Sequence, residues 1–281
     1  MPSLRFRIVN VFADTPLSGN PLCVFEDGRG LDDATMQALA LQFNLSETTF
    51  ILPSDTATVR VRIFTPTFEM PFAGHPTLGT SHVVRDLLRT TDSITLEMIA
   101  GIIPVTADAD MWTLAANPPK TRPAGVDRAA IAAMLRLLPD DVGDLPLWVD
   151  TGSEQLIVPL NSVDAVRRTE PDAGTVSQWP RSSTGRTMCY VWARAGANAV
   201  ESRFFFTRHS SVVEDPGTGS ACANLGGWML ATRQPLPVRL AVSQGAAVGR
   251  PCSLGLSVST ERQIGVSGRV VVLGTGSIEL P

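Results

Sequence analysis

The sequence has very little of the chemistry that several common classes of protein need. It contains a single lysine, Lys120, in the loop-like run Asn117–Lys120. A Schiff-base mechanism needs a positioned lysine amine, so we expect no pyridoxal phosphate. Positive charge is not in excess either, because 23 Lys and Arg against 27 Asp and Glu leave a net charge of −4. This balance argues against a nucleic-acid-binding surface.

Paired cysteines and long apolar runs are also lacking. The four cysteines stand far apart and include no Cys-x-x-Cys pair: Cys23, Cys189, Cys222 and Cys252. A small disulfide-stapled secreted domain would be denser in cysteine, so we expect four reduced thiols. No apolar run approaches the roughly 18–20 residues that span a bilayer, and the N-terminus lacks the apolar stretch of a signal peptide. The sequence thus predicts a soluble, cytoplasmic protein with no membrane partner.

Metal and dinucleotide sites are not supported. The three histidines, His75, His82 and His209, do not have the short spacings of a zinc site. Gly217-x-Gly219 begins like a dinucleotide-binding fingerprint, but Cys222 stands where its third glycine belongs. No Asp or Glu occurs from position 216 to 260, so the ribose-binding acid of such a site is missing. We therefore predict neither a metal nor a cofactor.

What the chain does have is a core composition and many turns. Hydrophobic residues make up 44% and charged residues 18%, which suits a buried core, and 23 glycines with 21 prolines suit tight turns. Apolar or alternating runs predict strands at 7–12, 22–25, 48–52, 59–64, 93–98, 102–107, 148–151, 155–160, 187–193 and 203–207. Helices are expected after Asp32 or Asp33, from Pro76, from Asp127 to Leu138, and over 221–231. The Pro-rich stretch 117–123 looks like a linker and is the best candidate for a domain boundary.

A weak internal repeat relates the two halves. The run Arg62–Thr65 resembles Arg203–Thr207, and each is followed by an acidic residue, Glu69 or Glu214. A glycine and a polar residue then open a helix: Gly74-His75 in the first half and, 145 positions later, Gly219-Ser220. Two copies at this spacing predict two similar domains rather than a solenoid.

Both glycine-led helix starts are candidate anion sites, because unpaired backbone N–H groups and the positive end of the helix dipole meet there. If the halves face each other, both helix starts would point into one cleft that suits a carboxylate. Glu47 and Asp215 are candidate proton carriers, since a carboxylate in a partly dry cleft can take and return a proton. The plainer alternatives stay open at this point: glycines that only permit turns, Glu47 as a surface acid and Asp215 as a capping residue.

Five sequence blocks together resemble the phenazine-biosynthesis PhzF-like family. They are Ser18–Pro21, Asn44–Thr48, Phe72–Thr77, Glu214–Ala221 and Gln244-Gly245 with Gly249–Pro251, in this order along nearly the whole chain. The resemblance implies a diaminopimelate-epimerase-like fold of the α/β (α+β) class, with two pseudo-symmetric domains. Each would be a curved, mostly antiparallel sheet wrapped around a central helix. We expect one domain at 1–117 plus about 265–281, and the other at 118–264.

The resemblance also implies roles for particular residues. Glu47 would be the general acid/base, with His75 and Asp215 beside the reacting atoms. The substrate carboxylate would be bound by Gly74, Gly219 and Ser220. Asn20 would also bind substrate, with Gln244 and Arg250 further out. The family resemblance suggests a homodimer as well.

One departure from the wider fold narrows the reaction. Cofactor-independent epimerases of this architecture place a cysteine before each glycine, whereas this sequence has Ala73 and Thr218 there. Without opposed thiols, we predict an isomerase in which one carboxylate moves a proton, and with it a double bond, in a small carboxylic acid. The alternatives are an amino-acid epimerase or racemase, and a non-catalytic ligand-binding protein. The presence of Glu47, His75 and Asp215 together speaks against the last, because a binding module needs no proton carrier.

Overall fold

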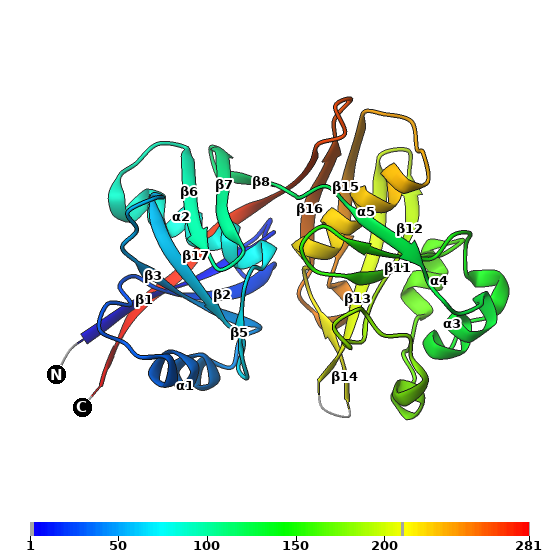
Figure 1. The fold of residues 1–281 in the computed structure, drawn as a ribbon, viewed down its shortest axis with the longest axis horizontal. Coiled ribbons are helices and arrows are strands. Elements are labelled where there is room, and N and C mark those ends of the chain that lie inside the picture. The colour runs from blue at the N-terminus through cyan, green and yellow to red at the C-terminus, as the bar shows by residue number, and fades with distance from the viewer. Residues whose placement is uncertain (1–2, 209–210, 281) are drawn as a thin grey trace. The chain divides into compact units, whose positions relative to one another are not determined.

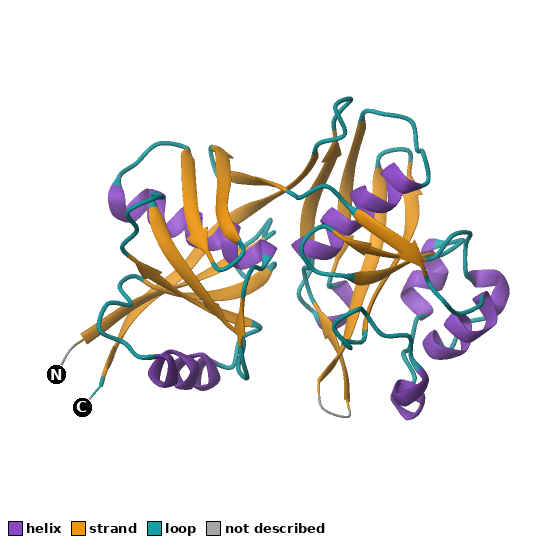
Figure 2. Ribbon diagram, in the orientation of Figure 1, coloured by secondary structure: helices purple, strands orange, loops and turns teal. Residues whose placement is uncertain are grey.

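The computed structural model describes residues 3–208 and 211–280, and the chain divides into two compact units (Figure 1). Unit 1 is Met1–Ala115 with Ser267–Pro281, and unit 2 is Ala116–Val266. Both units are rich in strands and poor in helices, as expected for the α+β class (Figure 2). Within the described ranges, no helix has the length and apolar character needed to cross a membrane.

The strands of unit 1 form a single curved sheet. They are β1 (Ser3–Val11), β2 (Asn20–Phe25), β3 (Glu47–Leu52), β4 (Val59–Phe64), β5 (Glu69–Met70), β6 (Ser93–Met98), β7 (Gly101–Asp108), β8 (Met111–Ala115) and most of β17 (Ile264–Glu279). Neighbouring strands follow the order β17-β1-β2-β3-β4-β6-β7-β8, and β8 pairs in turn with β17, which closes the sheet. The β2–β3 and β4–β6 pairs are parallel, and the sheet is otherwise mostly antiparallel.

One helix fills the inside of this sheet. Helix α2 (Gly74–Leu88) contacts β1, β2, β3, β4, β6, β7 and β8, so its first ten residues are almost all buried. Its small residues make this possible: a Cβ on Gly79 would lie 2.7 Å from a Leu22 methyl and 2.8 Å from a Val11 methyl. The buried Thr80 hydroxyl of α2 pairs with the Thr49 hydroxyl at 2.8 Å. Helix α1 (Asp33–Phe43), capped by Asp32, packs on a separate apolar cluster outside the sheet.

Unit 2 contains the remaining elements. Its strands are β9 (Lys120–Pro123), β10 (Leu147–Asp150), β11 (Gln155–Pro159), β12 (Met188–Gly196), β13 (Ala199–Arg208), β14 (Ser211–Asp215), β15 (Val238–Gln244), β16 (Cys252–Val258) and the start of β17. Its helices are α3 (Arg128–Leu135), α4 (Val163–Arg168) and α5 (Gly219–Ala231), with 3₁₀ turns η1 (Pro139–Asp141), η2 (Ala173–Gln178) and η3 (Ala246–Val248). Helix α5 lies against β9, β10, β11 and β16, as α2 lies inside unit 1.

The two units have the same strand connections, which establishes the internal duplication. In unit 1, β1–β2, β3–β4, β4–β5 and β6–β7 are antiparallel while β2–β3 and β4–β6 are parallel. In unit 2, β10–β11, β12–β13, β13–β14 and β15–β16 are antiparallel while β11–β12 and β13–β15 are parallel. Six pairings thus recur in the same order, with α2 and α5 at the same place in each series. The predicted fold, with two similar domains each built around a central helix, is confirmed.

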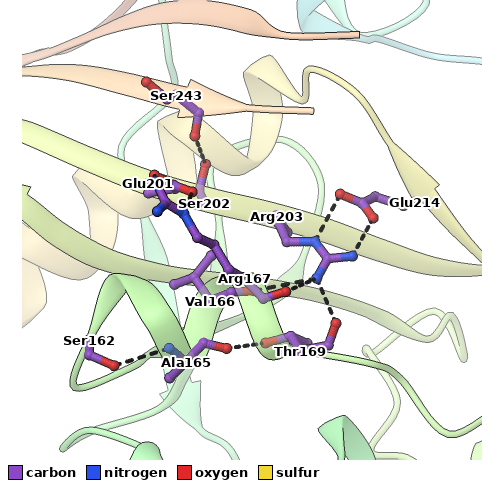
Figure 3. Close-up of polar contacts among 10 residues, drawn as sticks. All are labelled: Ser162, Ala165, Val166, Arg167, Thr169, Glu201, Ser202, Arg203, Glu214 and Ser243. Carbon is purple, nitrogen blue, oxygen red and sulfur yellow. Dashed lines mark hydrogen bonds and ion pairs between the residues drawn. The ribbon is translucent and has the colours of Figure 1, made fainter. Parts of the chain in front are cut away.

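The repeated Arg and Glu of the sequence motif form an equivalent ion pair in each unit. Arg203 meets Glu214 through two bonds of 3.0 and 2.7 Å (Figure 3). Arg62 meets Glu69 through two bonds of 2.6 Å. Arg203 also donates to the backbone carbonyl of Thr169 at 2.6 Å, just beyond α4 (Figure 3). Each arginine therefore fixes a β-hairpin, and neither acid is a candidate proton carrier.

Some expected elements differ in the structure. The stretch predicted as a linker, 117–123, contains β9, which pairs with β10. Helix α3 ends at Leu135 with Arg136 in the left-handed region, so Leu138 lies outside it with 68% of its surface exposed. Helix α2 begins at Gly74, as the Gly74-His75 motif predicted, rather than at Pro76. The sequence reading also missed α4 and the strands β8, β15 and β16.

Candidate active site

Glu47 begins β3, directly after the turn that ends α1. Asn44 adopts the left-handed conformation and closes the last turn of α1, so the chain can change direction before the strand starts. Glu47 stands beside Leu22 in the parallel β2–β3 pair, and the next three residues of β3 are buried. Only 15% of the Glu47 side chain is exposed. Its carboxylate therefore lies in a mostly dry setting.

His75 lies in the first turn of α2, beside Glu47. Its Nε2 is 3.5 Å from Glu47 Oε2, and its Nδ1 is 3.4 Å from Asn20 Nδ2. Burial lowers the pKa of His75 to about 3, partly opposed by a hydrogen bond to the Pro21 backbone. The imidazole is therefore neutral near pH 7.

The start of α2 supplies backbone donors at the same place. Its cap residue, Ala73, makes no side-chain hydrogen bond to the helix, and Pro76 has no N–H group. Gly74 and His75 therefore provide the N–H groups of the first turn. Asn20 reaches His75 because Gly19 turns the chain sharply, at φ +82°, where a Cβ would lie 2.6 Å from the Val11 carbonyl oxygen. Unit 1 thus brings together Glu47, His75, Asn20 and Gly74.

Asp215 of unit 2 is the last residue of β14, shortly before α5 begins. The Thr218 hydroxyl donates to Asp215 Oδ2. Gln244, at the end of β15, donates to the Asp215 carbonyl oxygen at 2.8 Å and to Thr218 Oγ1 at 3.0 Å, and accepts from the Thr218 N–H at 3.2 Å. Gln244, which the resemblance placed further out, therefore holds the turn that leads into α5.

Gly219 and Ser220 form the first turn of α5, with Thr218 as a cap that makes no side-chain bond to the helix. The Ser220 hydroxyl accepts a hydrogen bond from Gln155 Nε2 at 2.9 Å. Unit 2 thus groups Asp215, Gly219 and Ser220. The sequence reading missed Gln155, although a glutamine at the start of the apolar run 155–160 was a signal for a buried polar partner.

The other histidines and the cysteines contribute little to these groups. His82 accepts a hydrogen bond from Trp112 Nε1 at 3.2 Å and is a packed residue, while His209 lies outside the described residues. Cys222 is fully buried in α5, and burial raises the pKa of its thiol to about 12. The part of the chain that the structure describes contains no group of three or more His, Cys, Asp or Glu that could hold a metal ion.

Comparison with known proteins shows to which family the chain is similar. The model of the phenazine biosynthesis-like protein family matches residues 9–279. An uncharacterized isomerase of Pasteurella multocida is 36% identical over 279 residues, which cover 98% of this chain and 94% of that protein. A trans-2,3-dihydro-3-hydroxyanthranilate isomerase of Pseudomonas aeruginosa is 33% identical over 251 residues, 88% of this chain and 87% of its own.

A solved structure agrees with the fold. The crystal structure of a Bacillus anthracis phenazine biosynthesis protein of the PhzF family matches with a TM-score of 0.85 and 23% identity, and all of both chains are covered. The resemblance noted in the five sequence blocks is thereby confirmed. The chain belongs to the phenazine biosynthesis-like, or PhzF, family and is an isomerase.

Proposed function

We propose that the protein is a cofactor-independent isomerase that shifts a double bond in a small carboxylic acid, with Glu47 as the only proton carrier. Glu47 takes a proton from a carbon next to a conjugated double bond. It then returns the proton to another carbon of the same conjugated system, on the same face. One C–H bond breaks and another forms, so the reaction needs no oxidant, reductant or second base.

The contact between Glu47 and a neutral His75 is the main support for this assignment. An imidazolium at 3.5 Å would favour the ionised carboxylate and oppose its protonation. Because burial keeps the imidazole uncharged, His75 does not add a positive charge that would hold the carboxylate ionised. A group that must accept and return a proton within each turnover benefits from this balance.

The substrate class follows from the backbone donors and from the relatives. Backbone N–H groups at the starts of α2 and α5 favour a carboxylate ligand. A relative named trans-2,3-dihydro-3-hydroxyanthranilate isomerase makes cyclic, amino-acid-derived dienoic acids the first substrates to test.

The alternative, an epimerase that uses two thiols, is less well supported. Ala73 and Thr218 precede the two helices, so no thiol stands at either position. Cys222 is buried with a raised pKa, which disfavours the thiolate that such chemistry needs.

Exchange of Glu47 for glutamine tests the proposal. Glutamine keeps the shape of the side chain but cannot carry a proton, so Glu47→Gln should fold and bind ligand while turnover falls by roughly 10²–10⁴-fold. The assay follows trans-2,3-dihydro-3-hydroxyanthranilate and related dienoic acids in D₂O by NMR. Wild-type product should contain solvent deuterium unless the carboxyl proton is shielded during turnover.

A matched variant controls for the loss of one carboxylate. Glu279→Gln makes the same change in unit 1 at an exposed position of β17 and should leave turnover unchanged. If Glu47→Gln stays active while Cys222→Ala is inactive, the single-carboxylate mechanism is wrong and a thiol mechanism takes its place.

A further inference from the structure

Buried polar side chains in unit 2 form a hydrogen-bond network that ends at Ser220, here called the polar network. Thr151 donates to Asn224 Oδ1 through its N–H at 2.9 Å and its hydroxyl at 2.7 Å. Asn224 Nδ2 donates to Gln155 Oε1 at 2.8 Å, and Gln155 Nε2 donates to the Ser220 hydroxyl at 2.9 Å. Thr151, Gln155 and Asn224 are all buried, so water does not compete for these bonds.

The Thr151 N–H group fixes which atom donates and which accepts in every hydrogen bond of the polar network. The Thr151 backbone N–H can only donate, so the atom of Asn224 that faces it must be the amide oxygen. The Asn224 nitrogen therefore points the other way, where it also donates to the Ser153 carbonyl oxygen at 2.8 Å. Gln155 must then turn its oxygen towards Asn224 and its nitrogen towards Ser220. Because the Ser220 oxygen accepts from Gln155, its own hydrogen is directed to a second partner.

Unit 1 shows that the fold itself does not need the polar network. The equivalent positions follow from the shared strand pairings and from the alignment of Gly74 with Gly219. On this basis Val11 corresponds to Thr151, Leu22 to Gln155 and Gly79 to Asn224. The unit 1 residues are apolar and lie against one another, since a Cβ on Gly79 would meet both Leu22 and Val11. Apolar packing is enough to support the fold at these positions, so the polar network of unit 2 has another role.

We propose that Asn224 and Gln155 are positioning residues that make the Ser220 hydroxyl a hydrogen-bond donor to the substrate carboxylate. The proposal rests on the proposed function, which places a carboxylate at the start of α5. The Gln155 bond occupies one lone pair of the Ser220 oxygen and leaves the hydroxyl hydrogen for an acceptor group of the ligand, so the polar network favours a carboxylate there. Ser220 of unit 2 would therefore contribute to the preference for an acid.

A double-mutant cycle on ligand binding tests this role. The variants are Gln155→Leu, which introduces the unit 1 residue, Ser220→Ala, and the two combined. The probe is anthranilate, and calorimetry measures its dissociation constant. Loss of one directed bond to a charged group should weaken binding about tenfold or more in each single variant. In the Ser220→Ala background, Gln155→Leu should cost less than about twofold, because the residue through which it acts is gone.

A second substitution guards against misfolding. Gln155→Met keeps the length of the side chain and should behave like Gln155→Leu, with Asn224→Gly giving a smaller effect of the same sign. Equal losses for Gln155→Leu in both backgrounds would overturn the proposal, and so would a wild-type protein that does not bind anthranilate. These results are independent of the Glu47 experiment. A cycle that contradicts the role of Gln155 does not affect the deuterium assay, and the binding cycle can still be interpreted if Glu47→Gln proves active.

Discussion

Removal of the buried imidazole in His75→Gln should change how the stability of unit 1 depends on pH. The folded protein holds His75 neutral because burial lowers its pKa from the ordinary 6.5 to about 3. In the unfolded chain the same group takes up a proton as the pH falls through about 6.5. Between these two pKa values the unfolded state binds one proton more, so protons favour unfolding.

The size of the effect follows from the two pKa values. The stabilising contribution is fully present above the unfolded pKa and is lost as the pH falls towards the folded one. Its slope is about 1.4 kcal/mol for each pH unit inside that window. Integration from pH 7 to pH 5 gives a decrease of about 2 kcal/mol in the free energy of unfolding of the wild type. The glutamine variant does not show this decrease. All other titrating groups are common to both proteins and cancel in the comparison.

Hydrogen exchange measures this difference where it should arise. The amides of α2 report on the opening of the unit 1 core, so the two units need not unfold together for the analysis to hold. Opening free energies are compared at pH 7 and pH 5, after correction for intrinsic exchange rates. NMR titration of the ¹³C-labelled His75 ring checks the cause directly. A ring that titrates near pH 6.5, or equal pH effects in wild type and variant, would refute the reasoning.

Two further predictions concern the thiols and the repeated ion pairs. The buried Cys222 thiol, with its pKa raised to about 12, should not react with thiol reagents in the native state at pH 8, and Cys222→Ala should keep nearly full turnover in the isomerase assay. Arg62→Met and Arg203→Met should each destabilise only their own unit by about 2–4 kcal/mol, because each leaves a mostly buried glutamate without its partner. Hydrogen exchange of α2 and α5 separates the two units, and destabilisation of both by either variant would contradict the assignment.

The duplicated core was predictable because its signals are local in sequence. Runs such as Val59–Phe64 and Ser93–Met98 have the expected strand bounds, since alternating or β-branched residues favour extended backbone. The Arg62 and Arg203 motifs were recognised as a repeat, although the sequence did not reveal that each arginine holds a glutamate. The role of each arginine depends on the hairpin register, which only the folded sheet defines.

The polar network that ends at Ser220 could not be predicted either, because its contacts exist only in the folded protein. Thr151 follows β10, Gln155 begins β11 and Asn224 lies in α5, and nothing in their spacing marks them as neighbours. The glutamine at the start of the apolar run 155–160 indicates a buried polar group, but not which residues it contacts. The contact between Glu47 and His75 also depends on the packing of β3 against α2, although the family resemblance had already singled out both residues.

The duplication itself argues for a single proton carrier. Across the antiparallel pairs, Thr48 faces Phe64 in unit 1 as Cys189 faces Phe205 in unit 2, so Glu47 corresponds to Met188. Asp215 corresponds in the same way to Met70, because each residue ends the short strand before the central helix. A symmetric two-base mechanism would be expected to keep the same reactive group at equivalent positions of both units. Each acid is equivalent to a methionine of the other unit, so the duplication repeats neither carboxylate, which is the pattern expected if one carboxylate carries the proton.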